Sequence, residues 1–554
     1  MTDLNPENLH FIPLGGSEQF GVNLNVYAYD GKLLLVDCGI GFADERFPGV
    51  DLLLPDPVFL EDRRKDIAAL IVTHAHEDHV GAVAYLWPRL KCPIYCSKFT
   101  ARVLKNKLEE QGIRRAPVHE IEPLQTLLPA PFEVQFIPVS HSTPESMSLF
   151  ISCAAGTVVH SGDWNLDPAP VIGVKTDENV FKELGKKGVL AYIGDSTNAE
   201  VEGRSYSESE VYEALKDVFA EQKGRILITI FSSNIGRVQS IVKAAAANDR
   251  QVAVAGRSLH RMIAAAKECG YLQDVPDFVS EEDLTYIPHE KTVLLVTGSQ
   301  GEARAALARI ARGQHHFKIS KGDTVIFSAR AIPGNEGNIN HVKNNLVAAG
   351  VKVIAPETTN RIIHTSGHPR RGEITDMLQW LKPKIVVPVH GERVMLEAQA
   401  ELARELQVEH AIVPTNGAVI RLDEKAPAII DYAETGLLAI EPKRIVADNH
   451  KALSERRKLQ FTGSAHVSLV MDHKGHLLAE PQVSTMGLFD DQDDDEMEFV
   501  ETLPDEISDF INAMKPQDRG DDAGVAEKCR IALRNYINGY LGLKPKTVVH
   551  VTRV

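Results

Sequence analysis

The sequence predicts a large mixed α/β protein built in three parts. Short apolar runs separated by glycine and aspartate turns dominate the first part of the chain, a pattern typical of strands. A later stretch repeats an apolar run, a small polar turn and a helix-like segment, as α/β domains do. The length of 554 residues exceeds what one hydrophobic core usually serves, which suggests roughly three domains.

Composition excludes several classes of protein. The chain is 44% hydrophobic and 25% charged, as folded globular proteins are. The net charge of −16 argues against non-specific coating of nucleic acid, which depends on neutralising phosphates, but not against a local site. No run is long enough to span a membrane and no signal peptide precedes the first strand, so we expect a cytoplasmic protein without a membrane partner.

Four apolar runs near the N-terminus predict strands. They are LHFIPLG, NLNVYAYD, KLLLVDCG and IAALIVTH, which begin at residues 9, 23, 32 and 67. The last run leads into THAHEDH, residues 73–79, where three histidines and two acids share seven positions. His74 and His76 are two residues apart and face the same way on an extended segment, whereas Asp78 and His79 follow the turn.

Three more apolar runs end in side chains that bind metals. FEVQFIPV is followed closely by His141, GTVVHSGD ends at Asp163 and KIVVPVH ends at His390. Side chains at the ends of adjacent strands can converge on one rim, and imidazole with carboxylate is a preferred ligand set for zinc. The pattern therefore predicts two metal ions at this rim. Cys92 and Cys96 could form half of another zinc site, but no second pair follows, so we expect all six cysteines to be free thiols.

The middle of the chain repeats one unit four times. RILITIFSSNIGR, QVAVAGRSLHR, TVLLVTGSQGEAR and TVIFSARAIPGNEG each join an apolar run to a helix-like segment through small residues. Such turns expose backbone N–H groups at helix N-termini, where phosphate can bind. One such turn is common in α/β folds, but four together favour phosphate binding.

The C-terminal part begins with an acidic segment. FDDQDDDEMEFVETLPDE, residues 489–506, is predicted to be a linker or exposed loop, with a docking tail for a basic partner as the alternative. The following sequence predicts an amphipathic helix over 526–541 and a strand over 547–551. A small α+β domain results.

The motifs together resemble the metallo-β-lactamase superfamily, whose HxHxDH sequence is followed by a distant histidine and a distant aspartate. DSTNAE with Asp195, HTSGH at 364–368 and PVHGE with His390 are similar to the three motifs of β-CASP nucleases. The match runs from residue 9 to about residue 440, and with its small terminal domain the chain most resembles the bacterial ribonuclease J family.

This resemblance implies a metallo-β-lactamase αββα sandwich interrupted by a β-CASP α/β domain. It assigns residues 1–208 and 369–445 to the two parts of the sandwich, 209–368 to the insertion, and 446–554 to a linker and C-terminal domain. The implied ligands are His74, His76 and His141 for one zinc ion and Asp78, His79 and His390 for the other, with Asp163 bridging them. Asp37 corresponds to an acid that orients the ligand loop.

The resemblance also implies the substrate-binding residues. Asp78, Asp195 and His368 correspond to catalytic residues, and His368 would contact the scissile phosphate and protonate the leaving 3′ oxygen. The alternative for His368 is a purely structural role, as a loop histidine that caps a turn. The implied phosphate contacts are Ser233, Asn234, Ile235, His364, Thr365, Ser366, Gly367 and His368. Gly49, Asp51 and Asp448 resemble a loop pair that binds a structural cation such as Ca²⁺, or these acids simply cap turns.

The implied activity is metal-dependent hydrolysis of RNA: 5′-to-3′ exonuclease action on 5′-monophosphorylated ends together with endonuclease action, in rRNA maturation and mRNA decay. The resemblance implies two Zn²⁺ ions, with Mn²⁺ or Mg²⁺ as possible activators. It also implies a homodimer or homotetramer, with other RNA-decay proteins as partners. The alternatives are a β-CASP nuclease acting on DNA or tRNA ends, a small-molecule hydrolase, or an inactive RNA-binding subunit. The last is disfavoured because every expected ligand is present.

Overall fold

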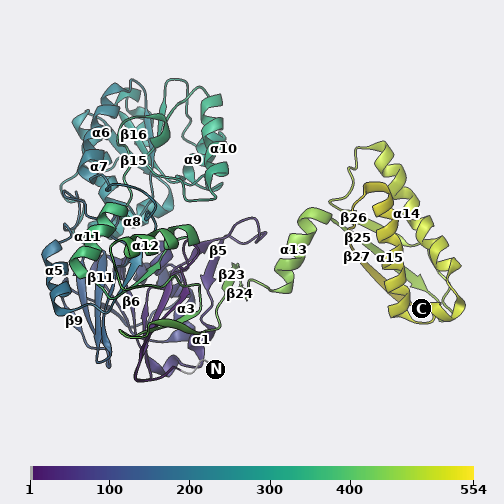
Figure 1. Ribbon diagram of the computed structural model, residues 1–554. Coiled ribbons are helices and arrows are strands. Elements are labelled where there is room, and N and C mark those ends of the chain that lie inside the picture. Colours follow the sequence, from purple (N-terminus) through teal and green to yellow (C-terminus); the bar gives the residue numbers. More distant parts are fainter. Residues whose placement is uncertain (1–3) are drawn as a thin grey trace. The chain divides into compact units, whose positions relative to one another are not determined.

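The computed structural model describes residues 4–554 and divides into two compact units (Figure 1). The larger unit comprises residues up to 42 together with 53–437, and the smaller comprises 43–52 together with 438–554. None of the helices within these described residues is long and apolar enough to cross a membrane.

Two sheets form the base of the larger unit. The first has the order β22-β21-β1-β2-β3-β6-β7-β8 and the second β20-β19-β13-β12-β11-β10-β9. The strands of the first sheet are β1 (Leu9–Gly15), β2 (Leu24–Tyr29), β3 (Lys32–Val36), β6 (Ile67–Val72), β7 (Ile94–Cys96), β8 (Val118–Glu120), β21 (Ala418–Leu422) and β22 (Ala428–Tyr432). Those of the second are β9 (Thr126–Leu127), β10 (Glu133–Pro138), β11 (Met147–Cys153), β12 (Gly156–His160), β13 (Ala191–Asp195), β19 (Ile385–Val389) and β20 (His410–Ala411).

One hydrophobic core joins the two sheets. It includes Phe11 and Ile71 from the first sheet and Phe136 and Ile193 from the second, all at most 1% exposed. Strand β6 lies between parallel neighbours, which is why its sequence is a continuous apolar run rather than an alternating one. The short strands β4 (Gly41–Phe42) and β5 (Leu52–Pro55) follow β3 along the chain.

Helices cover the outer faces of both sheets. On the first, α4 (Lys98–Glu110) packs against β7 and β8, with α3 (Val83–Leu90) and α1 (Val58–Glu61) beside it. On the second, α5 (Glu178–Lys187), α11 (Arg371–Leu381) and α12 (Arg393–Glu405) share a separate core with β19 and its neighbours. The predicted αββα sandwich is thereby confirmed.

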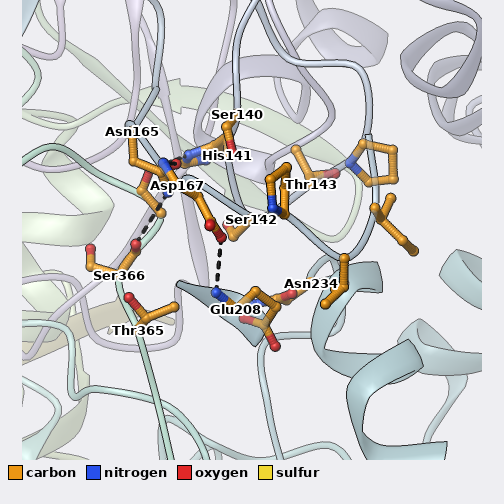
Figure 2. Close-up of a pocket in the computed structure, with 16 residues that line it drawn as sticks. Ser140, His141, Ser142, Thr143, Asn165, Asp167, Glu208, Asn234, Thr365 and Ser366 are labelled. Carbon is orange, nitrogen blue, oxygen red and sulfur yellow. Dashed lines mark hydrogen bonds between the residues drawn. The ribbon is translucent and has the colours of Figure 1, made fainter. Parts of the chain in front are cut away.

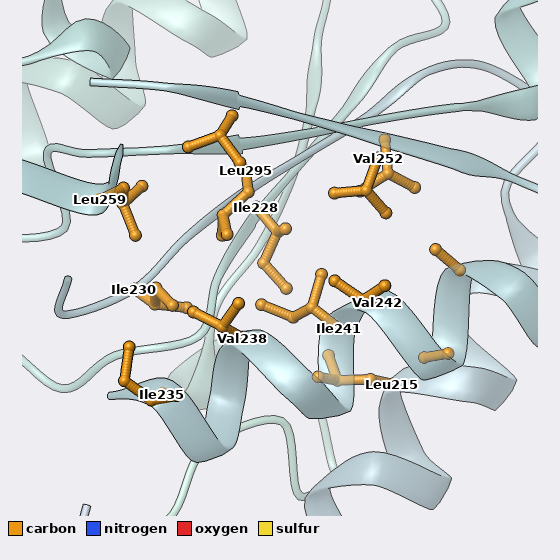
Figure 3. Packing of buried hydrophobic residues seen from close by; sticks show 14 of the residues in the cluster. Leu215, Ile228, Ile230, Ile235, Val238, Ile241, Val242, Val252, Leu259 and Leu295 are labelled. Atoms are coloured by element: carbon orange, nitrogen blue, oxygen red, sulfur yellow. The ribbon is translucent and has the colours of Figure 1, made fainter. Parts of the chain in front are cut away.

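The insertion is a five-stranded parallel sheet with the order β15-β16-β14-β17-β18. Its strands are β14 (Ile226–Thr229), β15 (Gln251–Ala255), β16 (Thr292–Val296), β17 (Thr324–Phe327) and β18 (Lys352–Ile354). Helices α6 (Glu208–Glu221), α7 (Ile235–Ala247) and α8 (Arg257–Glu268) share one core with the sheet, whereas α9 (Ala306–Ala311) and α10 (Glu336–Ala348) share another. Figure 3 shows α7 packing through Val238 and Ile241 beneath Ile228. All four predicted strand–turn–helix units occur.

The smaller unit contains a three-stranded sheet with the order β26-β25-β27. Its elements are the hairpin β23 (Leu437–Glu441) and β24 (Arg444–Ala447), then α13 (Lys451–Thr462), β25 (Ser464–Met471), β26 (Gln482–Met486), α14 (Asp494–Ala513), α15 (Asp522–Leu541) and β27 (Lys546–Arg553). The predicted last helix and strand are confirmed, each longer than expected.

The prediction of a loop over 489–506 is wrong, because most of this segment belongs to α14. Asp493 caps the helix by accepting hydrogen bonds from the N–H groups of residues 495 and 496, and acids in a first turn favour the helix dipole. Leu503, Ile507 and Ile511 then form a buried stripe at four-residue spacing in a core shared with α15. Most of that stripe lies beyond the acidic segment, so the segment by itself offered little to bury.

Candidate metal centre

The predicted ligands converge at one edge of the two sheets. Strands β10, β12, β13 and β19 run in the same direction, so their carboxyl ends lie together. His141, Asp163 and His390 follow three of these strands, and His74 follows β6 in the facing sheet. The strand-end pattern in the sequence therefore identified a real spatial cluster.

Asp163 lies at the centre of this cluster. Its Oδ2 is 3.3 Å from His79 Nε2, 3.5 Å from the Nε2 atoms of His74 and His390, and 3.8 Å from His141 Nε2. Asp163 Oδ2 and His74 Nε2 are buried, and neither has a hydrogen-bond partner among the residues that the structure describes. Buried polar atoms without partners are costly, and a cation between them would satisfy both.

Two overlapping groups have ligand atoms close enough to hold metal ions. One consists of His74, His76, His141 and Asp163; the other consists of Asp78, His79, Asp163 and His390. These are the two sets that the sequence resemblance implied. Imidazole and carboxylate donors of this number and kind fit zinc.

Burial keeps several of these imidazoles neutral. Burial lowers the pKa of His76 to about 4 and holds the pKa values of His74 and His141 well below the ordinary value, although nearby carboxylates oppose it. A metal ligand must present a free lone pair, so neutral imidazoles are the required form.

Asp37 contacts His79, a member of the second group, on the side away from Asp163. Burial would lower the pKa of His79, but Asp163, Asp37 and Asp78 raise it well above the ordinary value. Asp37 Oδ2 lies 2.7 Å from His79 Nδ1, and Asp37 Oδ1 accepts a hydrogen bond of 2.7 Å from the Thr73 N–H. Gly39 lets this loop approach closely, since a Cβ there would lie 1.6 Å from the Asp78 carbonyl oxygen. The geometry agrees with the orienting role expected for Asp37.

Asn23 is a site residue that the sequence reasoning missed. It is 2% exposed, its Nδ2 donates to the Asp78 carbonyl at 2.9 Å, and its amide group faces His390 Nδ1, with Nδ2 at 3.0 Å and Oδ1 at 3.2 Å. An Nδ1–H···Oδ1 bond leaves Nε2 of His390 unprotonated and free for a metal. Asn23 is the first residue of the run NLNVYAYD, but asparagine carries no ligand signal of its own.

Replacing Asn23 with alanine is expected to weaken metal binding by about 10- to 100-fold, because His390 loses the partner that sets its tautomer. Zinc retained after dialysis against a graded chelator measures this effect. Asn25→Ala is the matched control, since Asn25 is also buried and its Oδ1 finds no partner among residues 4–554. Equal zinc retention by both variants would contradict the role assigned to Asn23.

His368 and Asp195 form a pair beside the cluster. His368 Nδ1 is 2.8 Å from Asp195 Oδ2 and 3.7 Å from Asp163 Oδ2, and its ring stacks on that of His390. Burial lowers the pKa of His368, but the carboxylates of Asp195 and Asp163 outweigh it and raise the pKa to about 9. His368 is therefore an imidazolium at neutral pH in the metal-free protein. Its contacts are with these carboxylates, so it is more than a turn-capping histidine.

A polar pocket adjoins His141 (Figure 2). Its walls come from the sandwich and from the insertion, and they include Ser142, Asp167, Glu208, Asn234, Thr365 and Ser366. Gly367 joins the pocket to the cluster, because its carbonyl lies 2.7 Å from His141 Nδ1. A Cβ at Gly367 would lie 2.6 Å from His141 Cε1, so this contact requires glycine.

The predicted phosphate contacts are only partly brought together. Asn234, Thr365, Ser366 and Gly367 line the pocket. The side chain of Ile235 is fully buried in the core of the insertion (Figure 3), so only its backbone could reach a ligand. His364 lies 3.4 Å from Arg237 Nη1, and burial together with this arginine lowers its pKa to about 3. Ser233 is partly exposed beside the N-terminus of α7.

The other predicted sites lie elsewhere. Gly49, Asp51 and Asp448 belong to the smaller unit, and neither acid is part of a potential metal group in the described part of the chain. Cys92 and Cys96 are buried thiols, and neither is part of a potential metal group among the described residues. All six cysteines are free, as predicted.

Models of known protein families match nearly the whole chain. Residues 18–217 match the metallo-β-lactamase superfamily and 223–346 match the ribonuclease J β-CASP domain. Residues 352–414 match the Zn-dependent metallo-hydrolase RNA specificity domain, and 451–554 match the ribonuclease J C-terminal domain.

Individual relatives extend this result. Ribonuclease J of Sinorhizobium meliloti is 42% identical over 99% of this chain and 98% of its own length. Ribonuclease J of Synechocystis is 36% identical over 87% of this chain and 76% of its own. A crystal structure of a protein of unknown function from Enterococcus faecalis V583 shares the fold, with a TM-score of 0.54 and 16% identity over 75% of this chain and all of its own. With these identities and coverages, the chain belongs to the ribonuclease J family of the metallo-β-lactamase superfamily.

Proposed function

We propose that this protein is a metal-dependent ribonuclease that digests 5′-monophosphorylated RNA from its 5′ end and also cleaves RNA internally, in rRNA maturation and mRNA decay. The observation that carries the proposal is the buried Asp163 cluster opening onto a polar pocket, in a chain of the ribonuclease J family. The cluster supplies a place for hydrolysis, and the pocket a place for a terminal phosphate.

We assign two Zn²⁺ ions to the two overlapping groups, with Asp163 shared between them. Ions bound there would supply Lewis acidity, which polarises phosphoryl oxygens and makes water a stronger nucleophile at neutral pH. Activation by Mn²⁺ or Mg²⁺ bound to the same residues stays a prediction. A structural Ca²⁺ at Gly49, Asp51 and Asp448 is a second, separate prediction.

The protein's own residues orient the substrate and move a proton. Nδ1 of His368 is held by Asp195, so Nε2 carries the proton that we assign to the leaving 3′ oxygen. Burial opposes the charged form of His368, but the Asp195 carboxylate raises its pKa and so favours the protonated form that would attract the scissile phosphate. Asp78 completes the second metal group and Asp195 keeps the histidine oriented.

The pocket next to His141 would hold the terminal phosphate. Hydroxyl and amide groups of Asn234, Thr365 and Ser366 line it, and a phosphate needs such donors. We place a monophosphate beside the cluster, where the two further phosphates of a triphosphate would have to extend past it. We therefore expect the exonuclease mode to require a monophosphate, and the endonuclease mode to use RNA threaded past the cluster.

The test is cleavage of one uniformly labelled RNA bearing either a 5′-monophosphate or a 5′-triphosphate, with the same sequence in DNA alongside. We expect mononucleotides from the monophosphate RNA alone, and none after metal removal or with the Asp78→Ala/His79→Ala variant. Cleavage of DNA at an equal rate would favour a DNA nuclease. Binding without cleavage by the metal-loaded protein would favour an inactive RNA-binding subunit.

Assembly and location are separate predictions. We propose a homodimer or homotetramer that acts in the cytoplasm, with other RNA-decay proteins as possible partners. Light scattering of the purified protein tests the first part.

A further inference from the structure

Arg237 is a fully buried cation in the insertion. Its guanidinium makes a two-pronged ion pair with Glu208, with Nε 2.6 Å from Oε1 and Nη2 2.8 Å from Oε2. Nη1 donates to Ser328 Oγ at 2.6 Å and to the Ser328 carbonyl at 3.0 Å. Removing a guanidinium from water is expensive, so an arginine without any exposure calls for a specific reason.

The contacts of Arg237 reach the loop that forms one wall of the pocket. Nη1 lies 3.4 Å from the Ile363 carbonyl and 3.4 Å from His364 Nδ1. Ser328 Oγ also donates to the Ile363 carbonyl, at 2.6 Å. These bonds fix residues 363 and 364, and the chain continues directly into Thr365 and Ser366 at the pocket.

Glu208 carries the same network to the opposite wall. Glu208 itself lines the pocket, and its N–H donates to Asp167 Oδ2 at 2.8 Å (Figure 2). Asp167 lies on the loop after β12 that also carries Asp163. One ion pair therefore links the loop of the metal cluster to the loop of Ser366.

The third wall adjoins the same residue through its backbone, in an N-cap bond that does not involve the guanidinium. Asn234, at the N-terminus of α7, accepts a hydrogen bond of 2.8 Å from the Arg237 backbone N–H and also lines the pocket. The pair has an electrostatic effect as well. Without Arg237, the Glu208 carboxylate would stand uncompensated beside a phosphate, and like charges repel.

We propose that Arg237 and Glu208 form a positioning pair that sets the spacing of the pocket walls and thereby the preference for a 5′-monophosphate end. This inference rests on the proposed function and deepens it. Neither residue is assigned to the reacting atoms; both act through the loop that leads to Ser366 and through the Asp163 loop. Loss of such a pair should change the affinity for the terminal phosphate, and not only the stability of the fold.

The test compares KM and kcat for two oligoribonucleotides of one sequence, one with a 5′-monophosphate and one with a 5′-hydroxyl. Arg237→Lys is expected to reduce the monophosphate preference in KM by about tenfold, because lysine cannot replace a two-pronged guanidinium and small shifts of a bound phosphate cost much. Ser328→Ala, a milder change that removes one donor and one bond to Ile363, should reduce the preference by a smaller factor.

The chain offers a matched control in the same domain. Arg225 pairs with Asp323 at the other end of strands β14 and β17, with Nε 3.0 Å from Oδ1 and Nη2 2.5 Å from Oδ2. Arg225→Lys is expected to lower thermal stability without changing the ratio of the two KM values. Circular dichroism of every variant confirms that it is folded.

The outcomes separate the two proposals. If wild-type protein does not cleave RNA, the proposed function fails. If the wild type prefers the monophosphate and both Arg237→Lys and Ser328→Ala keep that preference, or if Arg225→Lys loses it equally, the pair is only structural and this inference is overturned. If Arg237→Lys does not fold, Ser328→Ala alone decides the question.

Discussion

Replacing Asp163 with asparagine is expected to lower RNA cleavage by about 10²- to 10³-fold or more, the largest effect of any single change. The substitution keeps the shape of the side chain but removes the negative charge shared by both potential metal groups. Within the two groups, one nitrogen from each of four histidines lies within 3.8 Å of Asp163 Oδ2, so neither group remains complete without it.

Metal binding gives this prediction a readout besides activity. Ligands that bind only the folded state raise its stability, so added zinc should raise the melting temperature of the wild type more than that of Asp163→Asn. Elemental analysis should find less zinc in the variant. Asp323→Asn is the control, because Asp323 is 1% exposed and pairs with Arg225 away from the cluster. Full zinc content in Asp163→Asn would exclude the shared-ligand role.

Replacing Asp37 with alanine is expected to cost about 3–5 kcal/mol of stability, as removing one partner of a buried charged pair does. Asp37 is 1% exposed and accepts hydrogen bonds from the Thr73 N–H and hydroxyl and from His79. The Thr73 N–H and His79 Nδ1 would be left buried without this acceptor. Chemical denaturation of the metal-free protein measures the loss.

A second variant shows how much stability is lost when a single hydrogen bond to Asp37 is removed. Thr73→Val removes only the hydroxyl donor and should cost about 1 kcal/mol. Asp37→Ala should also reduce zinc binding, because His79 loses the group that orients it. Equal destabilisation by Asp37→Ala and Thr73→Val would show that Asp37 has no special role.

The sequence predicted the cluster around Asp163 because several of its residues follow apolar runs. A run such as IAALIVTH predicts a buried strand, and the residue after it must lie at the sheet's edge. This local rule located His74, His141, Asp163 and His390 without knowledge of the sheet order. It could not locate Asn23, whose role depends on contacts with Asp78 and His390, far away in the chain.

One wrong prediction and one unexpected side-chain position have the same origin. The acidic segment at 489–506 was expected to be a loop, but its helix is stabilised by burying Ile507 and Ile511 in a core shared with α15. Ile235 was expected to contact substrate as part of a turn motif, but it is the first residue of α7 and its side chain faces the core. In both cases packing against a distant element decided the outcome.

The sequence by itself determined which residues can bind metal, which segments form the strands that carry them, and the family to which the chain belongs. Only the tertiary structure decided which nitrogen of His390 faces Asp163, which asparagine contacts its other nitrogen, and how Arg237 joins Glu208 to the loop at His364. Ligand identity and strand pattern are local properties, written in side-chain type and period. Tautomers, buried ion pairs and pocket walls depend on atoms brought together from remote parts of the chain, and local patterns do not encode those distances.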